Sequence, residues 1–170
     1  MVRREEQADL LRGLGARHVC NSTAPDYAQQ LAHALDRTGA RIAFDAIGGG
    51  ETAAMLLAAM ESAAAARMTS FDPYGSAEMK RVYLYGRLDP SDTRIPRGAY
   101  GLQWSIEGWA MPPVLERAGE ARRAELMARI AHGLDGTFAS DFHAEIGLAQ
   151  MLDPRVLQHV ARHETAGSTS

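Results

Sequence analysis

The sequence lacks the features that mark several large classes of protein. Cys20 is the only cysteine, which excludes a disulfide framework and a cysteine-rich zinc site within these 170 residues. No apolar run approaches the roughly 18 residues of a membrane span, and residues 1–10 are too charged for a signal peptide. The net charge of -3 gives no general attraction to nucleic acid or to an anionic membrane. We therefore expect a cytoplasmic protein without a nucleic-acid or membrane partner.

Catalytic and metal-binding motifs are also scarce. The sequence contains no G-x-S-x-G elbow and no cysteine–histidine nucleophile pair. His159 and His163 have the i,i+4 spacing of H-E-x-x-H, but the glutamate and a third ligand are absent, so no metal site is predicted. His143 and Glu145 have no partner set, which favours a surface or core role. The charges of residues 116–129 alternate in sign, as is typical of a solvated helix face.

The composition is that of an ordinary globular domain. Apolar residues make up 46% of the chain and charged residues 23%. A single domain of this length buries about 70% of the surface of its unfolded chain, which is enough for a sizeable core. We therefore expect one folded domain.

The most informative stretch is residues 41–52, which read RIAFDAIGGGET. A short apolar run with a single acid, Asp45, leads into three glycines and then into a helical pattern. A buried strand of a parallel sheet has this form. In open α/β sheets ligands bind beyond the carboxyl ends of the strands, so we expect function at this loop.

Residues 2–60 alternate between strand and helix patterns, which predicts a parallel sheet with right-handed crossovers. The expected strands are the end of one at residues 2–4, a second at 18–20 and a third at 41–46. The expected helices are residues 5–14, one from Pro25 to Gly39 capped by Ser22 or Thr23, and 51–60. Further along the chain the patterns predict strands within residues 81–88 and 100–111, a helix at 114–134, and mixed strand and helix at 137–163.

Four segments carry a resemblance to a known family: residues 2–22 (VRREEQADLLRGLGARHVCNS), 42–60 (IAFDAIGGGETAAMLLAAM), 80–89 (KRVYLYGRLD) and 138–154 (FASDFHAEIGLAQMLDP). In this order and spacing they resemble the nucleotide-binding part of the medium-chain dehydrogenase/reductase superfamily. The similarity is greatest to its zinc-free, quinone-oxidoreductase-like branch, often labelled zinc-binding dehydrogenase.

The resemblance implies an α/β fold: an incomplete Rossmann-like, doubly wound parallel sheet with a mixed α/β C-terminal extension. The first strand and its glycine-rich turn, together with the family's N-terminal catalytic domain, have no counterpart in these residues, so we expect a fragment. In the order 3-2-1-4-5-6, the fourth strand, residues 41–46, would have an open inner edge. The implied division is a partial NAD(P)-binding domain at residues 1–136 and a segment at 137–170 that packs towards the catalytic domain in full-length relatives.

The resemblance also implies cofactor contacts at strands two and three. Arg3 and Arg4 end the second strand, where NADP-preferring members carry basic residues for the 2′-phosphate. The alternative is a pair of solvated charges near the terminus. Asn21 and Ser22 end the third strand, where contacts to adenosine are implied. The alternative is that they only begin the next helix.

Two further groups follow from the ends of strands four and five. Ala46, Ile47 and Gly48 are expected to line the cofactor cleft. Gly48-x-Gly50-x-x-Ala53 also fits the loose dinucleotide fingerprint, although no strand ending in an acid follows about 20 residues on, and a tight turn is the third interpretation. Gly86, Arg87 and Leu88 are implied near the nicotinamide amide, with a plain strand terminus as the alternative.

The aromatic segment at residues 100–109 is the predicted interaction surface. In the superfamily the last strand pairs with its mate across a two-fold axis, which implies a homodimer through the strand around Leu102–Ile106. An uncharged stretch suits a covered edge strand better than an exposed one. Ordinary core is the alternative.

The function implied by the resemblance is that of an NADPH-dependent oxidoreductase that passes a hydride to a quinone or to an activated alkene or carbonyl. NADPH is expected rather than NADH, no zinc is implied, and no residue is assigned as catalytic. The alternative is a non-catalytic remnant or dimerising subunit without independent activity. A methyltransferase-like domain, suggested only by FDAIGGG, does not explain the segments after residue 80.

Overall fold

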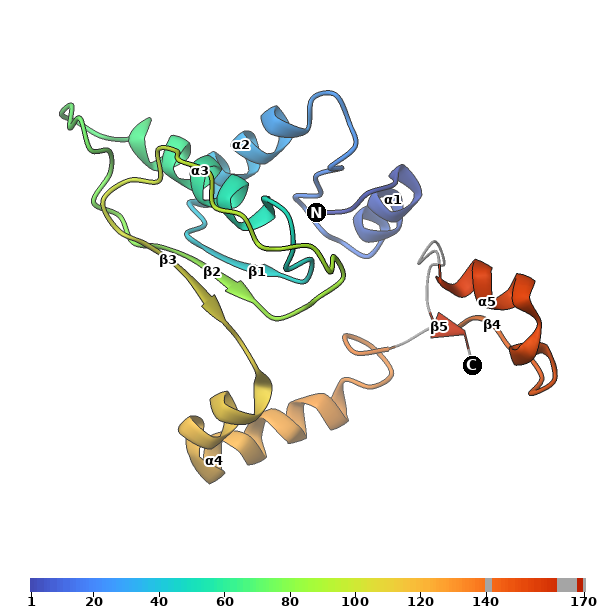
Figure 1. Cartoon of the computed structure of the whole chain (residues 1–170). Coiled ribbons are helices and arrows are strands. Elements are labelled where there is room, and N and C mark those ends of the chain that lie inside the picture. Colours follow the sequence, from blue (N-terminus) through green and yellow to red (C-terminus); the bar gives the residue numbers. More distant parts are fainter. Residues whose placement is uncertain (140–141, 162–167, 170) are drawn as a thin grey trace. The chain divides into compact units, whose positions relative to one another are not determined.

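The computed structural model describes residues 1–139, 142–161 and 168–169. The chain forms two compact units, Met1–Met111 and Pro112–Ser170, which are drawn in Figure 1. The expected boundary after residue 136 stays a prediction.

The first unit is built on a three-stranded parallel sheet. Its strands are β1 (Ile42–Asp45), β2 (Lys80–Leu84) and β3 (Trp104–Gly108), in the order β1-β2-β3. Its helices are α1 (Glu5–Gly13), α2 (Tyr27–Thr38) and α3 (Thr52–Ala65). All strand pairs are parallel and each connection is long enough for a crossover. The expected partial Rossmann-like α/β fold is confirmed.

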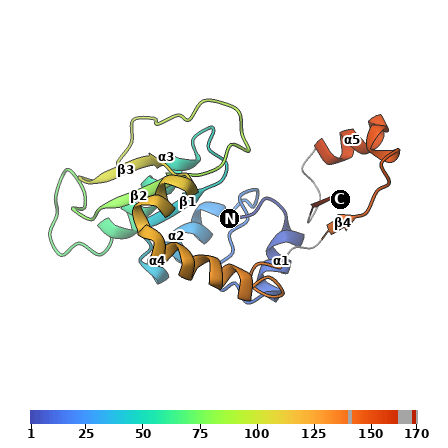
Figure 2. The same cartoon turned by 90° about the horizontal axis from the view of Figure 1, so that it is seen from below.

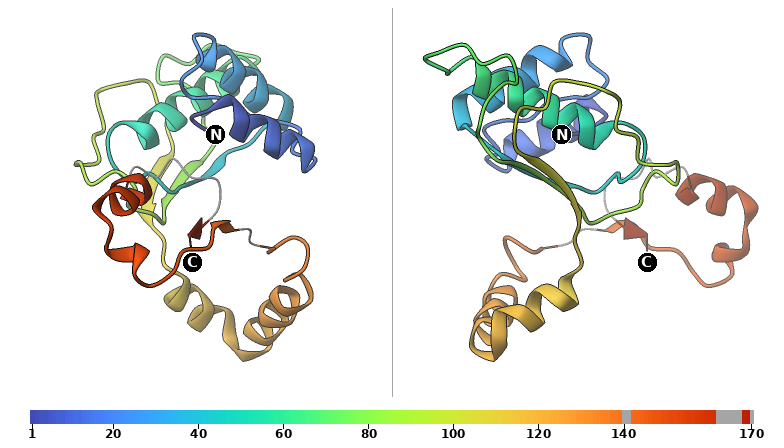
Figure 3. Two further views of the ribbon diagram at one scale, coloured as in Figure 1. Left: turned by 90° about the vertical axis from the view of Figure 1, so that its right-hand side faces the viewer. Right: turned by 60° about the vertical axis from the view of Figure 1, so that its left-hand side comes forward.

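Helices α2 and α3 lie on the same side of the sheet (Figures 1 and 3). Helix α2 is amphipathic and buries Leu31 and Leu35, and it ends at Gly39 in the left-handed conformation, as predicted. Helix α3 is rich in alanine and leucine and is buried on most of its surface, because it packs against both α2 and the sheet. On the sheet, Val82 is fully buried beneath these helices. This face forms the core of the unit.

The opposite face of the sheet is uncovered within this unit. Ile42 and Phe44 are exposed by 55% and 60%, and the ring of Phe44 stacks on Tyr83. Among the described residues, β1 pairs only with β2. The Arg81 N–H donates to the Arg41 carbonyl, and the Tyr85 N–H donates to the Asp45 carbonyl. The backbone N–H and C=O groups of the odd-numbered residues of β1 therefore face β2. The backbone of Ile42 and Phe44 therefore points to the free edge, as expected for this strand.

The region before α2 departs from the sequence prediction. The expected strand at residues 18–20 is replaced by one parallel bridge between Val2 and Asn21, and in the described part of the chain no longer ladder forms there. Helix α2 begins after Asp26, so the predicted caps are wrong. The Ser22 hydroxyl instead donates to the Val2 carbonyl, and the Thr23 hydroxyl to the Arg3 carbonyl. These hydroxyls fix the N-terminus to the turn rather than beginning a helix.

The second unit combines helices with short strands. Helix α4 (Met111–His132) starts earlier than predicted and is broken at Gly119, whose φ of 78° and ψ of 167° are not helical; the two segments are visible in Figure 2. A parallel pair, β4 (Phe142–Ala144) and β5 (Ser168–Thr169), follows, with a 3-10 turn at Gln150–Leu152 and helix α5 (Pro154–Ala161). This agrees with the expected mixed extension.

A buried ion pair joins α3 to β2 in the first unit. Lys80 is fully buried and Glu61 is 4% exposed. The Lys80 ammonium donates to Glu61 Oε2 at 2.5 Å, to Ser76 Oγ at 2.9 Å and to the Glu78 carbonyl at 2.8 Å, which satisfies its three donors. Glu61 also accepts the Ser76 N–H and hydroxyl, both at 2.6 Å. This network fastens the connection before β2 to the core.

Candidate functional site

Two segments meet at the carboxyl ends of β1 and β2, residues 45–51 and residues 86–94. We call them the carboxyl-edge platform. The N–H groups of Leu88 and Asp89 donate to the carbonyls of Ala46 and Ile47 at 3.3 and 3.0 Å. Further along, the Arg94 N–H donates to the Gly50 carbonyl at 2.8 Å. The structure thus brings two of the predicted groups together, Ala46–Gly48 and Gly86–Leu88.

Glycine is required at this platform because the two backbones touch. Gly48 has a φ of 78°, and a Cβ there would collide with the Gly86 carbonyl. A Cβ on Gly86 would collide with the Ala46 carbonyl and lie 2.7 Å from Ala46 Cα. A Cβ on Gly49 would lie 2.7 Å from the carbonyl oxygens of both Asp89 and Ser91. Gly48, Gly49 and Gly86 therefore allow the two segments of the platform to come into contact.

The local charge does not suit a pyrophosphate at the glycines. The Gly50 N–H is already used, donating to the Asp92 carbonyl and the Ser91 hydroxyl, both at 3.1 Å. Asp89 adds a carboxylate beside Gly49 and Gly50. Hydrogen bonds from the Ser91 N–H and hydroxyl lower the pKa of Asp89, so this carboxylate is ionised at neutral pH. The geometry therefore disfavours the dinucleotide fingerprint, and the cleft-lining interpretation of Ala46–Gly48 stays a prediction.

Asp45, the last residue of β1, begins the first segment of the platform. Its side chain is 3% exposed, and Oδ1 accepts the Ile47 N–H at 2.8 Å. This bond shapes the turn that leads to Gly48. Oδ2 is buried and has no hydrogen-bond partner in the described part of the chain.

The second predicted group lies at the N-terminus, around the bridge between Val2 and Asn21. The side chain of Asn21 donates to Glu5 Oε2 at 3.0 Å and accepts from the Thr23 hydroxyl at 2.9 Å. Hydrogen bonds from Arg12 and then from Asn21 lower the pKa of Glu5. Asn21 therefore holds α1 to the turn through bonds within the chain.

Arg3 and Arg4 supply positive charge at this N-terminal group. Arg3 is exposed and Arg4 is half-buried. Across residues 1–139, 142–161 and 168–169, neither guanidinium forms a hydrogen bond or an ion pair. The backbone of Arg3 is held by the Thr23 hydroxyl at 3.0 Å. Both guanidiniums can therefore receive a phosphate without breaking an existing bond.

The described part of the chain has neither a metal-binding cluster nor a membrane-spanning helix. It contains no group of three or more His, Cys, Asp or Glu residues placed to hold a metal ion. His159 lies on α5, whereas His163 is outside the described residues. None of the described helices is long and apolar enough to cross a membrane.

Comparisons with known proteins agree with this fold. No protein-family model matches the chain, and no curated protein matches it. Among solved structures, the chain is similar to a Mesorhizobium loti protein that bears the name putative NADPH:quinone reductase, with a TM-score of 0.68 and 25% sequence identity. The match covers 99% of this chain and 43% of that protein, so the chain spans less than half of its length.

The fold is that of the nucleotide-binding part of the medium-chain dehydrogenase/reductase superfamily. Within the superfamily it is the quinone-reductase-like form, as the resemblance of the four sequence segments predicted.

Proposed function

We propose that this chain is the nucleotide-binding part of an NADPH-dependent oxidoreductase that transfers a hydride to a quinone or to an activated alkene or carbonyl. The observation that carries the proposal is the carboxyl-edge platform, where the ends of two parallel strands contact each other through glycines. Ala46, Ile47 and Gly48 lie beside Gly86, Arg87 and Leu88, and the two segments together form one wall of the cofactor site. The cofactor supplies the hydride, and the chain supplies binding and orientation.

The preference for NADPH over NADH rests on Arg3 and Arg4. Their unpaired guanidiniums suit the additional 2′-phosphate, because a guanidinium can donate two parallel hydrogen bonds to phosphate oxygens. Asn21 and Ser22 complete this side of the site and contact the adenosine.

A fluorescence titration of the 170-residue chain with NADPH and with NADH tests this proposal. We expect saturable binding that favours NADPH. An Arg3→Ala/Arg4→Ala double variant should lose about tenfold or more in NADPH affinity, because charge-assisted hydrogen bonds are lost, while its NADH affinity should change little. An Arg12→Ala variant is the matched control, because Arg12 pairs with Glu5 and Asp9 instead. Equal binding of both cofactors, unaffected by the double variant, would refute the role of Arg3 and Arg4.

The second candidate is a non-catalytic, dimerising subunit. The exposed side chains of Ile42 and Phe44, on the uncovered face of the sheet, favour this candidate. A complete doubly wound sheet covers such side chains. We propose the opposite edge, around Leu102–Ile106, as the homodimer contact; Leu102 is 51% exposed there. Sedimentation of the chain should show a dimer that a Leu102→Asp substitution dissociates. A wild-type chain that stays monomeric would refute the contact. A folded dimer that binds neither cofactor would support this candidate over the reductase.

A further inference from the structure

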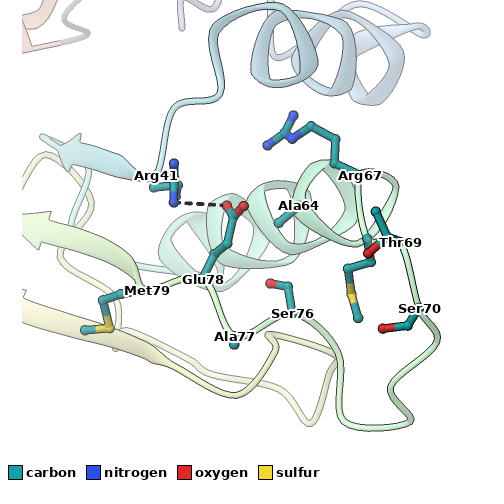
Figure 4. A pocket seen from close by; sticks show the side chains of 10 residues that line it. Arg41, Ala64, Arg67, Thr69, Ser70, Ser76, Ala77, Glu78 and Met79 are labelled. Atoms are coloured by element: carbon teal, nitrogen blue, oxygen red, sulfur yellow. Dashed lines mark ion pairs between the residues drawn. The ribbon is translucent and has the colours of Figure 1, made fainter.

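A cavity of about 610 Å³ lies at the amino ends of β1 and β2, away from the carboxyl-edge platform. Arg41 directly precedes β1, and Glu78 and Met79 directly precede β2. The end of α3 and the connection that follows supply the other walls (Figure 4). Its volume is in the range of small-molecule sites, about 300–1,000 Å³. Its polar lining includes Arg41, Arg67, Thr69, Ser70, Ser76 and Glu78.

Two arginines provide hydrogen-bond donors that the fold leaves largely unused. Arg41 Nη1 lies 3.3 Å from Glu78 Oε2, and Arg67 Nη1 lies 3.6 Å from Asp36 Oδ1. Both are long ion pairs, and in the described part of the chain neither guanidinium makes a hydrogen bond. Each guanidinium has five N–H donors in a planar fork that matches the oxygens of a phosphate. The cavity thus holds two cations with free donors.

Neutral donors lie on the other side of the same cavity. Figure 4 shows Arg41 and Glu78 on one side, Thr69 and Ser70 on the other, and Ser76 between them. The hydroxyls of Thr69 and Ser70 make no hydrogen bond to the rest of the described chain. Hydroxyls of this kind complete the coordination of phosphate oxygens beside arginine.

Glu78 provides the complementary acceptor. Its Oε2 is buried and accepts no hydrogen bond from the described residues, although Arg41 is close. The Glu78 side chain as a whole is 34% exposed, so its carboxylate can accept a hydrogen bond from an O–H group of a ligand. The Glu78 carboxylate would repel a second anionic group on the same ligand. The cavity therefore suits a ligand that has both an oxyanion and hydroxyl groups.

The wall between these groups is rigid. Ser76 uses its N–H and its hydroxyl to bond Glu61, which is paired with the buried Lys80. The backbone entering Ala77 and Glu78 is therefore fixed by the core before any ligand arrives. A site held in this way needs little rearrangement to bind, which favours affinity.

We propose that this cavity binds the phosphate monoester of a small polyol, such as a sugar phosphate. The phosphate is held by Arg41, Arg67 and the hydroxyls of Thr69 and Ser70, and a polyol hydroxyl donates to the Glu78 carboxylate. The proposal is independent of the cofactor site, because it concerns the other end of the strands.

Calorimetric titration of the full 170-residue chain at constant ionic strength tests the phosphate part, with ribose 5-phosphate, inorganic phosphate and ribose as probes. Ribose 5-phosphate should bind saturably and ribose should not. Arg41→Gln and Arg67→Gln should each weaken ribose 5-phosphate binding by about tenfold or more. Arg41→Lys should not restore it fully, because lysine lacks the fork. Arg94→Gln is the matched control, since Arg94 has a similarly long ion pair, 3.5 Å to Glu51, at the other end of the sheet.

The Glu78→Gln variant tests the polyol part. It should weaken binding of ribose 5-phosphate, while binding of inorganic phosphate stays equal or becomes tighter because the carboxylate repulsion is gone. An equal effect on both ligands, or none on either, would overturn the role of Glu78. Absence of saturable binding would overturn the site itself. Binding that is lost in Arg3→Ala/Arg4→Ala, but kept in Arg41→Gln and Arg67→Gln, would place the phosphate at the nucleotide site instead.

Discussion

Replacing Lys80 with methionine is expected to destabilise the first unit by about 3–5 kcal/mol, the usual cost of removing one partner from a buried ion pair. The Glu61 carboxylate would remain in the core with only the Ser76 donors. Urea unfolding monitored by tryptophan fluorescence reports on this unit, because the two tryptophans of the sequence, Trp104 and Trp109, both lie within it. A loss of this size is a large fraction of the stability of a domain.

The pH dependence separates an electrostatic cause from simple loss of packing. In the wild type, burial raises the pKa of Glu61, but hydrogen bonds from Lys80 and Ser76 outweigh it, so that the pKa lies below the ordinary value. This pair therefore contributes stability at neutral pH that is lost as the pH falls below about 5. In Lys80→Met only burial and Ser76 act on Glu61, so protonation should relieve part of the damage.

The destabilisation of Lys80→Met should accordingly shrink as the pH falls from 7 towards about 4. The double variant Lys80→Met/Glu61→Gln serves as the control. It should be less destabilised than the sum of its two single variants, because neither charge is left alone in the core. A loss that is equal at every pH, with additive single variants, would contradict this account of the pair.

Replacing Gly86 with alanine is expected to separate the two segments of the platform. The new Cβ would meet the backbone of Ala46 rather than a flexible side chain, so the strand ends must move apart. Overpacking of this kind costs about 1–3 kcal/mol of stability. Because Ala46–Gly48 and Gly86–Leu88 face the cofactor together in our proposal, NADPH affinity should fall further than the stability loss alone explains.

Gly108→Ala is the matched control for this prediction. Gly108 ends β3 as Gly86 follows β2, but an added Cβ there meets nothing within 4 Å. Its stability should change by no more than about 0.5 kcal/mol, and its NADPH affinity should not change. NADPH binding that is unaffected by Gly86→Ala in a folded chain would show that the contact between the strand ends is not part of the cofactor site.

The order of strands and helices in the first unit could be predicted because it depends on sequence patterns that extend over a few neighbouring residues. The run from Ile42 to Asp45 is apolar, glycines follow it, and Gly39 ends the preceding helix, and each of these signals acts over a few residues. The predicted strand at residues 18–20 was wrong because strand formation depends on a partner strand, and among the described residues this region forms one bridge, between Val2 and Asn21.

The contacts that build the two proposed sites could not be predicted in the same way. Residues 86–94 bond to residues 45–51 through backbone groups, which leave no signature in the side-chain pattern apart from the glycines. Lys80 and Glu61 are residue types that normally lie at the surface, so nothing local indicated their burial. Their spacing follows no motif, because the fold brings α3 and β2 together.

Residue-by-residue NMR mapping of NADPH on the isotope-labelled chain locates the cofactor site. The backbone signals of residues 46–48 and 86–88 should shift on binding, together with those of Arg3 and Arg4, while those of residues 67–79 should not. Shifts confined to residues 67–79, or saturable binding without any change at the carboxyl ends of β1 and β2, would contradict the assignment of the cofactor site.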